Sequence, residues 1–232
     1  MKFEQYVVKE IVHESEEVRT FRLAKQEGSV PDYKPGHFFL LRLPGEDGKP
    51  CQRSYSAASH PSEPLLSFCI KLKGSFTHLL WNLKEGDSLE VDGPYGTFLL
   101  LPDDSERVFI GGGVGISGLR SQILETVNEG RVCSLFHSGH GFGNLTYFNE
   151  MKKLSEEHDG FKFFPSITGD DPPPGWDGLA GRINVQILQE KLGSLAGKAF
   201  YLCGSKEMAG ELAAALIAAG VPREKVKKDE WG

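Results

Sequence analysis

The sequence predicts a two-domain protein, with an antiparallel β-barrel or sandwich in residues 1–102 and a parallel α/β sheet in residues 103–232. Its length of 232 residues suits two domains of ordinary size. Before about Pro102 the apolar runs are short and are separated by turn residues, which is typical of antiparallel strands. After Asp103 apolar strands alternate with helical patterns, as in a parallel sheet covered by helices on both faces.

In the first half, each predicted strand is an apolar run bounded by Gly, Pro or Asp. We expect strands over residues 6–12, 18–23, 37–43, 53–57, 65–72 and 88–91. One helix is expected over residues 76–84, because leucines and a phenylalanine recur there at helical spacing behind Gly74 and Ser75.

In the second half, strands and helices are expected in pairs. The pairs cover residues 107–110 and 117–128, 132–136 and 145–157, 161–167 and 184–192, and 199–202 and 206–219. The residues from Val226 onward form either a short last strand or a frayed charged tail. Since parallel sheets of this kind bind ligands beyond the carboxyl ends of their strands, a site is expected there.

Composition excludes several classes of protein. A content of 39% hydrophobic and 25% charged residues is that of a globular chain. The net charge is -6 and no basic stripe is present, so nucleic acid is not expected as a partner. Residues 212–219 form the longest apolar run, which is shorter than the ~20 residues of a membrane-spanning helix. The first ten residues lack the pattern of a signal peptide, and we therefore expect a cytoplasmic protein.

The four cysteines are widely spaced in the sequence. Cys51, Cys69, Cys133 and Cys203 form no CxxC pair, so neither a bound metal nor an iron–sulfur cluster is expected. Taken alone, Cys203 is a small residue at the end of a buried strand, where a cysteine often serves only as a hydrophobe.

A glycine-rich turn in the second half is the most informative local feature. An apolar strand, Val108 to Ile110, leads into Gly111-Gly112-Gly113-Val114-Gly115 and then into a helix. Such a turn leaves backbone N–H groups available to a phosphate, or it serves only to pack a strand closely on a helix. The spacing differs from the G-x-G-x-x-G fingerprint of ordinary dinucleotide-binding dehydrogenases.

Two segments of the first half have chemistry that suits a flavin nucleotide. In Arg53-Ser54-Tyr55-Ser56, strand alternation places the guanidinium and the phenol ring on one face, where they suit a pyrophosphate and a flavin ring. The same residues also suit a half-buried edge strand. Gly74-Ser75-Phe76-Thr77 begins the expected helix and is either an ordinary helix cap or a second phosphate site.

Five motifs together resemble the ferredoxin-NADP reductase family in their order and approximate spacing, over essentially the whole chain. They are Arg53-Ser54-Tyr55-Ser56, Ile70-Lys71 with Gly74-Ser75-Phe76-Thr77, Gly93-Pro94-Tyr95-Gly96-Thr97-Phe98, Gly112 to Ser117, and Tyr201-Leu202-Cys203-Gly204. The resemblance implies an antiparallel FAD-binding β-barrel followed by a Rossmann-like parallel-sheet domain that binds NAD(P).

The resemblance also implies a role for each matching residue. Arg53 would bind the FAD pyrophosphate, Tyr55 would pack on the isoalloxazine ring, and Ser56 would lie near flavin N5. The remaining implied FAD contacts are Ser54, Ile70, Lys71, Gly74, Ser75, Phe76, Thr77 and Trp231. The implied NAD(P) contacts are Gly112, Gly113, Val114, Gly115, Ser138, Tyr147, Cys203 and Gly204.

Ser56, Cys203 and Glu230 are the candidate catalytic residues. In the family pattern Cys203 would lie where the nicotinamide meets the flavin, Glu230 would relay protons, and Trp231 would cover a ring face.

The chain departs from the family pattern in the nucleotide loop, where Val114 and Gly118 stand in place of the usual threonine and proline. Coenzyme choice is weakly marked. Ser138 and Tyr147 favour NADP slightly, and Arg182 could reach the 2′-phosphate, but residues 136–140 contain no arginine.

The activity implied is hydride transfer between NAD(P)H and FAD N5, with single electrons passed to or from a separate carrier such as ferredoxin or flavodoxin. We expect a monomer that meets an acidic carrier through a local basic patch. The candidate lysines are Lys71, Lys73, Lys84, Lys227 and Lys228. Two alternatives are a reductase that uses free flavin as a substrate and a non-catalytic nucleotide-binding subunit.

Overall fold

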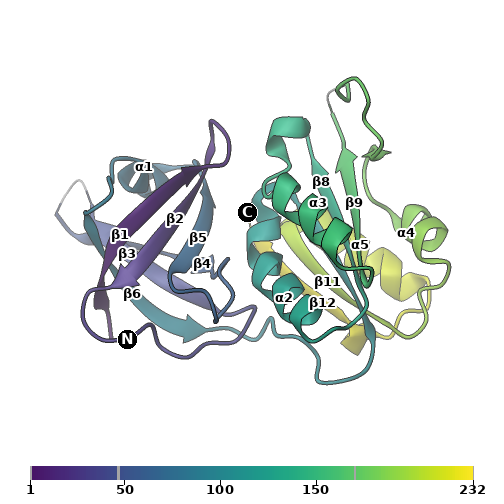
Figure 1. The fold of residues 1–232 in the computed structure, drawn as a ribbon, viewed down its shortest axis with the longest axis horizontal. Coiled ribbons are helices and arrows are strands. Elements are labelled where there is room, and N and C mark those ends of the chain that lie inside the picture. Colours follow the sequence, from purple (N-terminus) through teal and green to yellow (C-terminus); the bar gives the residue numbers. More distant parts are fainter. Residues whose placement is uncertain (1, 46–47, 170, 232) are drawn as a thin grey trace. The chain divides into compact units, whose positions relative to one another are not determined.

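The chain forms two compact units. The computed structural model describes residues 2–45, 48–169 and 171–231. One unit consists of Met1–Leu100 with Arg120–Gln122, and the other of Leu101–Leu119 with Ile123–Gly232. Figure 1 shows an antiparallel sheet in the first unit and a helix-flanked parallel sheet in the second. The predicted fold class, an antiparallel β-barrel followed by a parallel α/β domain, is confirmed.

The first unit is built on a six-stranded antiparallel sheet. Its strands are β1 (Glu4–His13), β2 (Val18–Lys25), β3 (Phe38–Pro44), β4 (Pro50–Ser56), β5 (Leu66–Lys71) and β6 (Ser88–Tyr95), in the order β4-β3-β6-β1-β2-β5. The two edge strands, β4 and β5, also contact each other, which curls the sheet into a barrel. Alternate residues such as Tyr6, Leu23, Phe39 and Leu41 fill the interior because side chains along a strand point to opposite faces.

The helix of this unit, α1 (Ser75–Trp81), ends earlier than the expected Lys84. Phe76 and Leu80 join the barrel core from it. After Trp81 the chain tightens, since Leu83 N–H donates to the carbonyl of Leu80 rather than to that of Leu79. A turn follows, so helical spacing in the sequence extended the prediction beyond the real helix.

The second unit contains a six-stranded parallel sheet in the order β10-β9-β8-β7-β11-β12. Its strands are β7 (Glu106–Gly112), β8 (Cys133–Gly139), β9 (Phe161–Ile167), β10 (Leu179–Ala180), β11 (Lys198–Ser205) and β12 (Val226–Trp231). The connecting helices are α2 (Ile116–Asn128), α3 (Phe148–Glu157), α4 (Val185–Leu192) and α5 (Lys206–Ala218). β12 pairs with β11 along its length, so the alternative of a frayed tail is wrong for Val226–Trp231.

The helices cover both faces of the parallel sheet, as predicted. Leu188 of α4 and Leu212 of α5 share a buried cluster with Ile110 and Leu202 of the sheet. Helix α2 lies on the opposite face, because a Cβ built on Gly111 would lie 3.5 Å from Leu119 Cδ1. Strand alternation therefore gives this sheet two apolar faces.

The start of α3 differs from the prediction of a helix over residues 145–157. Leu145 follows a short 3-10 turn, Phe142–Asn144, and Tyr147 has a left-handed conformation with φ of 61°. That backbone conformation cannot continue into a right-handed helix, so α3 begins at Phe148. Tyr147 is consequently the residue that caps the helix and is not part of it.

The tightest packing in the second unit joins the glycine turn after β7 to the end of β11. A Cβ built on Gly115 would lie 2.2 Å from the carbonyl oxygen of Cys203 and 2.7 Å from its carbonyl carbon. A Cβ on Gly112 would lie 2.5 Å from Met208 Sδ. Only glycine allows the turn to lie so close to β11.

We expect Gly115→Ala to destabilise the second unit by about 2 kcal/mol, because backbone atoms must move to accept the methyl group. Calorimetric melting should show a transition several degrees lower. Gly210→Ala is the matched control, since Gly210 lies in α5 with open space around it and gains helix propensity of up to ~1 kcal/mol. A Gly115→Ala protein that melted at the wild-type temperature would contradict this packing.

Candidate functional site: two nucleotide-binding surfaces

The predicted NAD(P) residues meet at the carboxyl edge of the parallel sheet. Gly112 at the end of β7 lies opposite Ser138 of β8 in the strand register. On its other side, β7 pairs with β11, whose Gly204 lies opposite Glu230 of β12. Four adjacent strands therefore bring together residues that lie far apart in the sequence.

The glycine turn serves both of the functions that the sequence left open. Gly115 is needed for packing against the backbone of β11, and Gly112 lies against the Met208 side chain of α5. Gly113 differs, because its φ is +52° and a Cβ built on it would meet nothing within 4 Å. The following 3-10 turn and α2 begin with N–H groups that have no acceptor within the helix. An open, glycine-lined helix start fits a phosphate group.

His137 is a buried polar residue at this edge that the site prediction omitted. The ring has 0% exposure, and Nε2 lies 2.9 Å from the carbonyl oxygen of Gly113. Burial lowers the pKa of His137 to about 4, so the ring is neutral at pH 7. A histidine directly after the apolar residues Leu135 and Phe136 was the sequence signal, but its partner lies 24 residues earlier in the chain.

Cys203 is 2% exposed and lies between β7 and β12. The thiol is thus buried, as expected for a cysteine that serves only as a small hydrophobe. It also lies at the carboxyl edge of the sheet, where ligands of such folds bind. Its role toward a nicotinamide stays a prediction.

Glu230 is exposed and accepts a hydrogen bond from Lys228 Nζ at 2.8 Å. The backbone of Trp231 ends β12, but its side chain lies outside the described part of the chain.

The residues considered for coenzyme choice lie around the end of β8. Ser138 is half-buried, and its hydroxyl lies 3.5 Å from the carbonyl oxygen of Gly111, at the outer limit of a hydrogen bond. Tyr147 is half-buried in the turn before α3. Arg182 is 81% exposed and lies 3.7 Å from a carboxylate oxygen of Glu207, a weak surface pair.

In the first unit, the residues of β4 lie on the edge of the barrel sheet. Arg53 is exposed, with Nη1 donating to the carbonyl of Gln52 at 2.7 Å, and Ser54 is also exposed. Tyr55 is half-buried and stacks on Phe76 of α1, with ring centroids 6.1 Å apart and an interplanar angle of 24°. Burial raises the pKa of Tyr55 to about 12, so its phenol is neutral. An exposed guanidinium beside a fixed aromatic ring fits a flavin nucleotide.

The start of α1 offers backbone N–H groups and the exposed Ser75 hydroxyl, whereas the Thr77 hydroxyl is used within the turn. Gly74 caps the helix with φ of +85° and open space around its Cα. The Thr77 hydroxyl donates to the Gly74 carbonyl at 2.9 Å and accepts from the Lys73 N–H at 2.7 Å. The Thr77 hydroxyl makes two hydrogen bonds within the turn. The backbone donors that remain available to a phosphate at the start of α1 are therefore the N–H groups of Ser75 and Phe76.

Ile70 and Lys71 complete the residues predicted for the first unit. Ile70 is buried in the barrel core, so only its backbone could contact a cofactor. Lys71 Nζ lies 3.1 Å from Glu17 Oε2, with both side chains largely exposed. Ser56 is half-buried at the end of β4.

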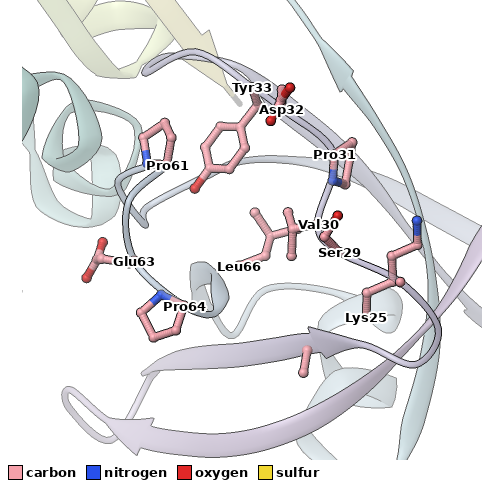
Figure 2. Close-up of a pocket in the computed structure, with 12 residues that line it drawn as sticks. Lys25, Ser29, Val30, Pro31, Asp32, Tyr33, Pro61, Glu63, Pro64 and Leu66 are labelled. Carbon is pink, nitrogen blue, oxygen red and sulfur yellow. The ribbon is translucent and has the colours of Figure 1, made fainter.

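The first unit also contains an open pocket of about 550 Å³ away from these residues. Figure 2 shows Tyr33, Val30 and Leu66 around it, with Pro61 and Pro64 on the facing loop. The pocket lies between the β2–β3 and β4–β5 connections. None of the residues predicted to bind FAD lines it.

The described ranges show neither a metal centre nor a membrane-spanning helix. They contain no group of three or more His, Cys, Asp or Glu side chains placed to hold a metal ion. None of their helices is long and apolar enough to cross a membrane.

Comparison with known families matches both halves of the chain. Residues 5–99 match the oxidoreductase FAD-binding domain, and residues 109–213 match the oxidoreductase NAD-binding domain. The two matches thus account for most of the chain, and each includes the glycine-rich or aromatic motif described above for its unit.

The chain is similar to parts of longer curated proteins. The chain is 28% identical over 198 residues to a subunit of the Na(+)-translocating NADH-quinone reductase of Pseudoalteromonas atlantica, covering 78% of this chain and 48% of that protein. It therefore spans about half the length of the curated relatives it matches.

Solved structures show the same fold. The FAD/NAD-binding domain of a nitric oxide dioxygenase from Vibrio cholerae superposes with a TM-score of 0.90 at 22% identity, covering 99% of this chain and 98% of that one. A ferredoxin NADP+ reductase from Neisseria gonorrhoeae, solved with FAD and NADP, gives a TM-score of 0.83 at 23% identity and covers 100% and 98%.

The predicted resemblance and the predicted cofactors, FAD and NAD(P), are confirmed by these matches. With its FAD-binding barrel and its NAD-binding parallel sheet, the chain belongs to the oxidoreductases that are built from these two domains, and its fold is that of ferredoxin-NADP reductase-like proteins.

Proposed function

We propose that this chain takes electrons in pairs from NAD(P)H and passes them singly to a separate acceptor protein. The observation that carries the proposal is the presence of both nucleotide-binding surfaces in one chain, each matched to its own family domain. When bound, FAD supplies the chemistry, because a flavin accepts two electrons together and releases them one at a time.

The first unit would bind FAD through β4 and α1. Arg53 would neutralise the pyrophosphate, with the N–H groups at the start of α1 as further donors. Tyr55 would hold the isoalloxazine ring in a fixed orientation because Phe76 already supports the phenol from one side. The role of Ser56, near flavin N5, rests on the family resemblance.

The second unit would bind the coenzyme along the carboxyl edge of its sheet. The turn at Gly113 and Val114 would hold the phosphates through backbone N–H groups. Cys203 and Gly204 would border the nicotinamide, and Glu230 would hold a proton-accepting carboxylate on the adjacent strand. Ser138 and Tyr147 would face the adenosine ribose.

We further propose that the electron acceptor is a ferredoxin- or flavodoxin-type carrier and that the protein works in the cytoplasm. The acceptor is proposed as a separate protein because the four cysteines lie on separate strands, with Cys133 at the start of β8 and Cys203 near the end of β11, and the described residues contain no group of three or more metal-binding side chains. The relatives named as parts of an NADH-quinone reductase suggest a second kind of acceptor, a neighbouring protein of a larger assembly.

The first test is a titration of the FAD-loaded protein with NADH and with NADPH under anaerobic conditions. We expect rapid loss of the flavin absorbance at about 450 nm with at least one coenzyme. A larger second-order rate constant for flavin reduction with NADPH would support Ser138 and Tyr147 as 2′-phosphate contacts. A larger rate constant with NADH would instead agree with the coenzyme in the relatives' name, NADH-quinone reductase. No bleaching with either coenzyme would leave only the non-catalytic alternative, and failure to retain FAD would favour the free-flavin reductase.

Tyr55→Ala should weaken FAD binding about tenfold, equivalent to ~1.4 kcal/mol, because the ring that faces the flavin and its stack on Phe76 are both lost. The dissociation constant can be measured by flavin fluorescence quenching. Tyr55→Phe is the matched control and should bind FAD nearly as well as the wild type. Equal affinity in the alanine variant would show that Tyr55 is an ordinary strand residue.

Cys203→Ala should slow flavin reduction by the coenzyme about tenfold, since alignment of the reacting atoms depends on the groups beside the nicotinamide. Stopped-flow absorbance measures this rate, and the FAD content should not change. Cys133→Ala is the control, because Cys133 is also buried but begins β8 at the opposite edge of the sheet. Equal rates in both variants would remove Cys203 from the site.

A further inference from the structure

The buried ring of His137 is attached to the glycine turn by one hydrogen bond of known direction. A carbonyl oxygen only accepts, so the Nε2 atom that lies 2.9 Å from the Gly113 oxygen must carry the proton. Nδ1 is then an acceptor, and it has no hydrogen-bond partner among the described residues. A buried polar atom without a protein partner is uncommon.

The hydrogen bond determines which way the next N–H group points. The Gly113–Val114 peptide is trans, and in a trans peptide the C=O and the following N–H point in opposite directions. With the Gly113 oxygen held against His137, the N–H of Val114 points away from the buried ring. Gly113 itself borders open space and has a left-handed φ of +52°, a region in which glycine can readily rotate.

We propose that His137 is a positioning residue for the coenzyme, holding the Gly113–Val114 peptide so that the Val114 N–H donates to the dinucleotide pyrophosphate. This inference rests on the proposed function of the second unit as the coenzyme-binding domain. Its neutral state fits the role, since burial keeps the pKa of His137 at about 4 and the Nε2 proton remains in place at pH 7. Val114 lacks a side-chain hydroxyl, so this turn depends on its backbone donors.

The variants that test the proposal are His137→Leu, which removes the donor, and His137→Gln, whose amide nitrogen can replace Nε2. His158→Leu is the control, because this exposed histidine follows α3 at the amino edge of the sheet. The probe is ADP-ribose, which contains the pyrophosphate but no nicotinamide, and its binding is measured by calorimetry. We expect about tenfold weaker binding in His137→Leu, and affinity close to the wild type in His137→Gln and His158→Leu.

A coenzyme titration and a spectrum of the unaltered protein complete the test. For His137→Leu the KM for the coenzyme should rise about tenfold, with a much smaller fall in kcat. In the wild type, the resonance of the Val114 amide proton should move downfield in the NMR spectrum when ADP-ribose is added. This measurement does not depend on whether a variant protein folds.

Three results would overturn the proposal: wild-type affinity in His137→Leu, no recovery in a folded His137→Gln protein, or an unmoved Val114 amide. If ADP-ribose binding depends on His137 but neither coenzyme bleaches the flavin, the phosphate site stands and the proposed electron transfer fails. If bleaching occurs and binding is insensitive to residue 137, only the role of His137 fails.

Discussion

The second unit depends on one close approach, that of the glycine turn after β7 to the last residues of β11. The backbone of Cys203 lies so near Gly115 that no side chain fits there, and the side chain of Met208 lies against Gly112. The contact fixes the start of α2 relative to the strand ends, so the helix N–H groups and Gly204 are held at one edge of the sheet. The surface proposed to bind phosphate depends on this packing, because the neighbouring peptide at Gly113 is left uncovered.

The two departures from the family pattern acquire a physical meaning in this setting. A threonine in place of Val114 would add a hydroxyl donor, and a proline in place of Gly118 would restrict the first turn of the helix. Without them, recognition at this turn depends on how its peptides are oriented. A buried neutral donor beneath Gly113 supplies such an orientation from the strand below, by a bond that uses none of the turn's own side chains.

Periodicity in the sequence predicted the fold well because the apolar runs of the long elements are separated by turn residues. The early end of α1, the strand β10 and the start of α3 were beyond it. The two-residue strand β10 is too short to show a period and is defined only by its pairing with β9. The start of α3 depends on the left-handed conformation of Tyr147, which tertiary context imposes on a residue that rarely adopts it. The site motifs were placed on the right elements, but contacts such as Tyr55 with Phe76 join segments distant in sequence.

Electrostatics constrain how a chain with net charge -6 could meet an acidic carrier. Among the lysines expected to form a basic patch, Lys71 is paired with Glu17 and Lys228 with Glu230. Exposed pairs of this kind contribute only ~0 to 1 kcal/mol, so a carrier's carboxylate can replace either partner at little cost. If the proposed carrier docked by replacing a carboxylate in these ion pairs, its affinity for this chain would be weak and salt-dependent. Weak binding suits a carrier that must leave after each electron.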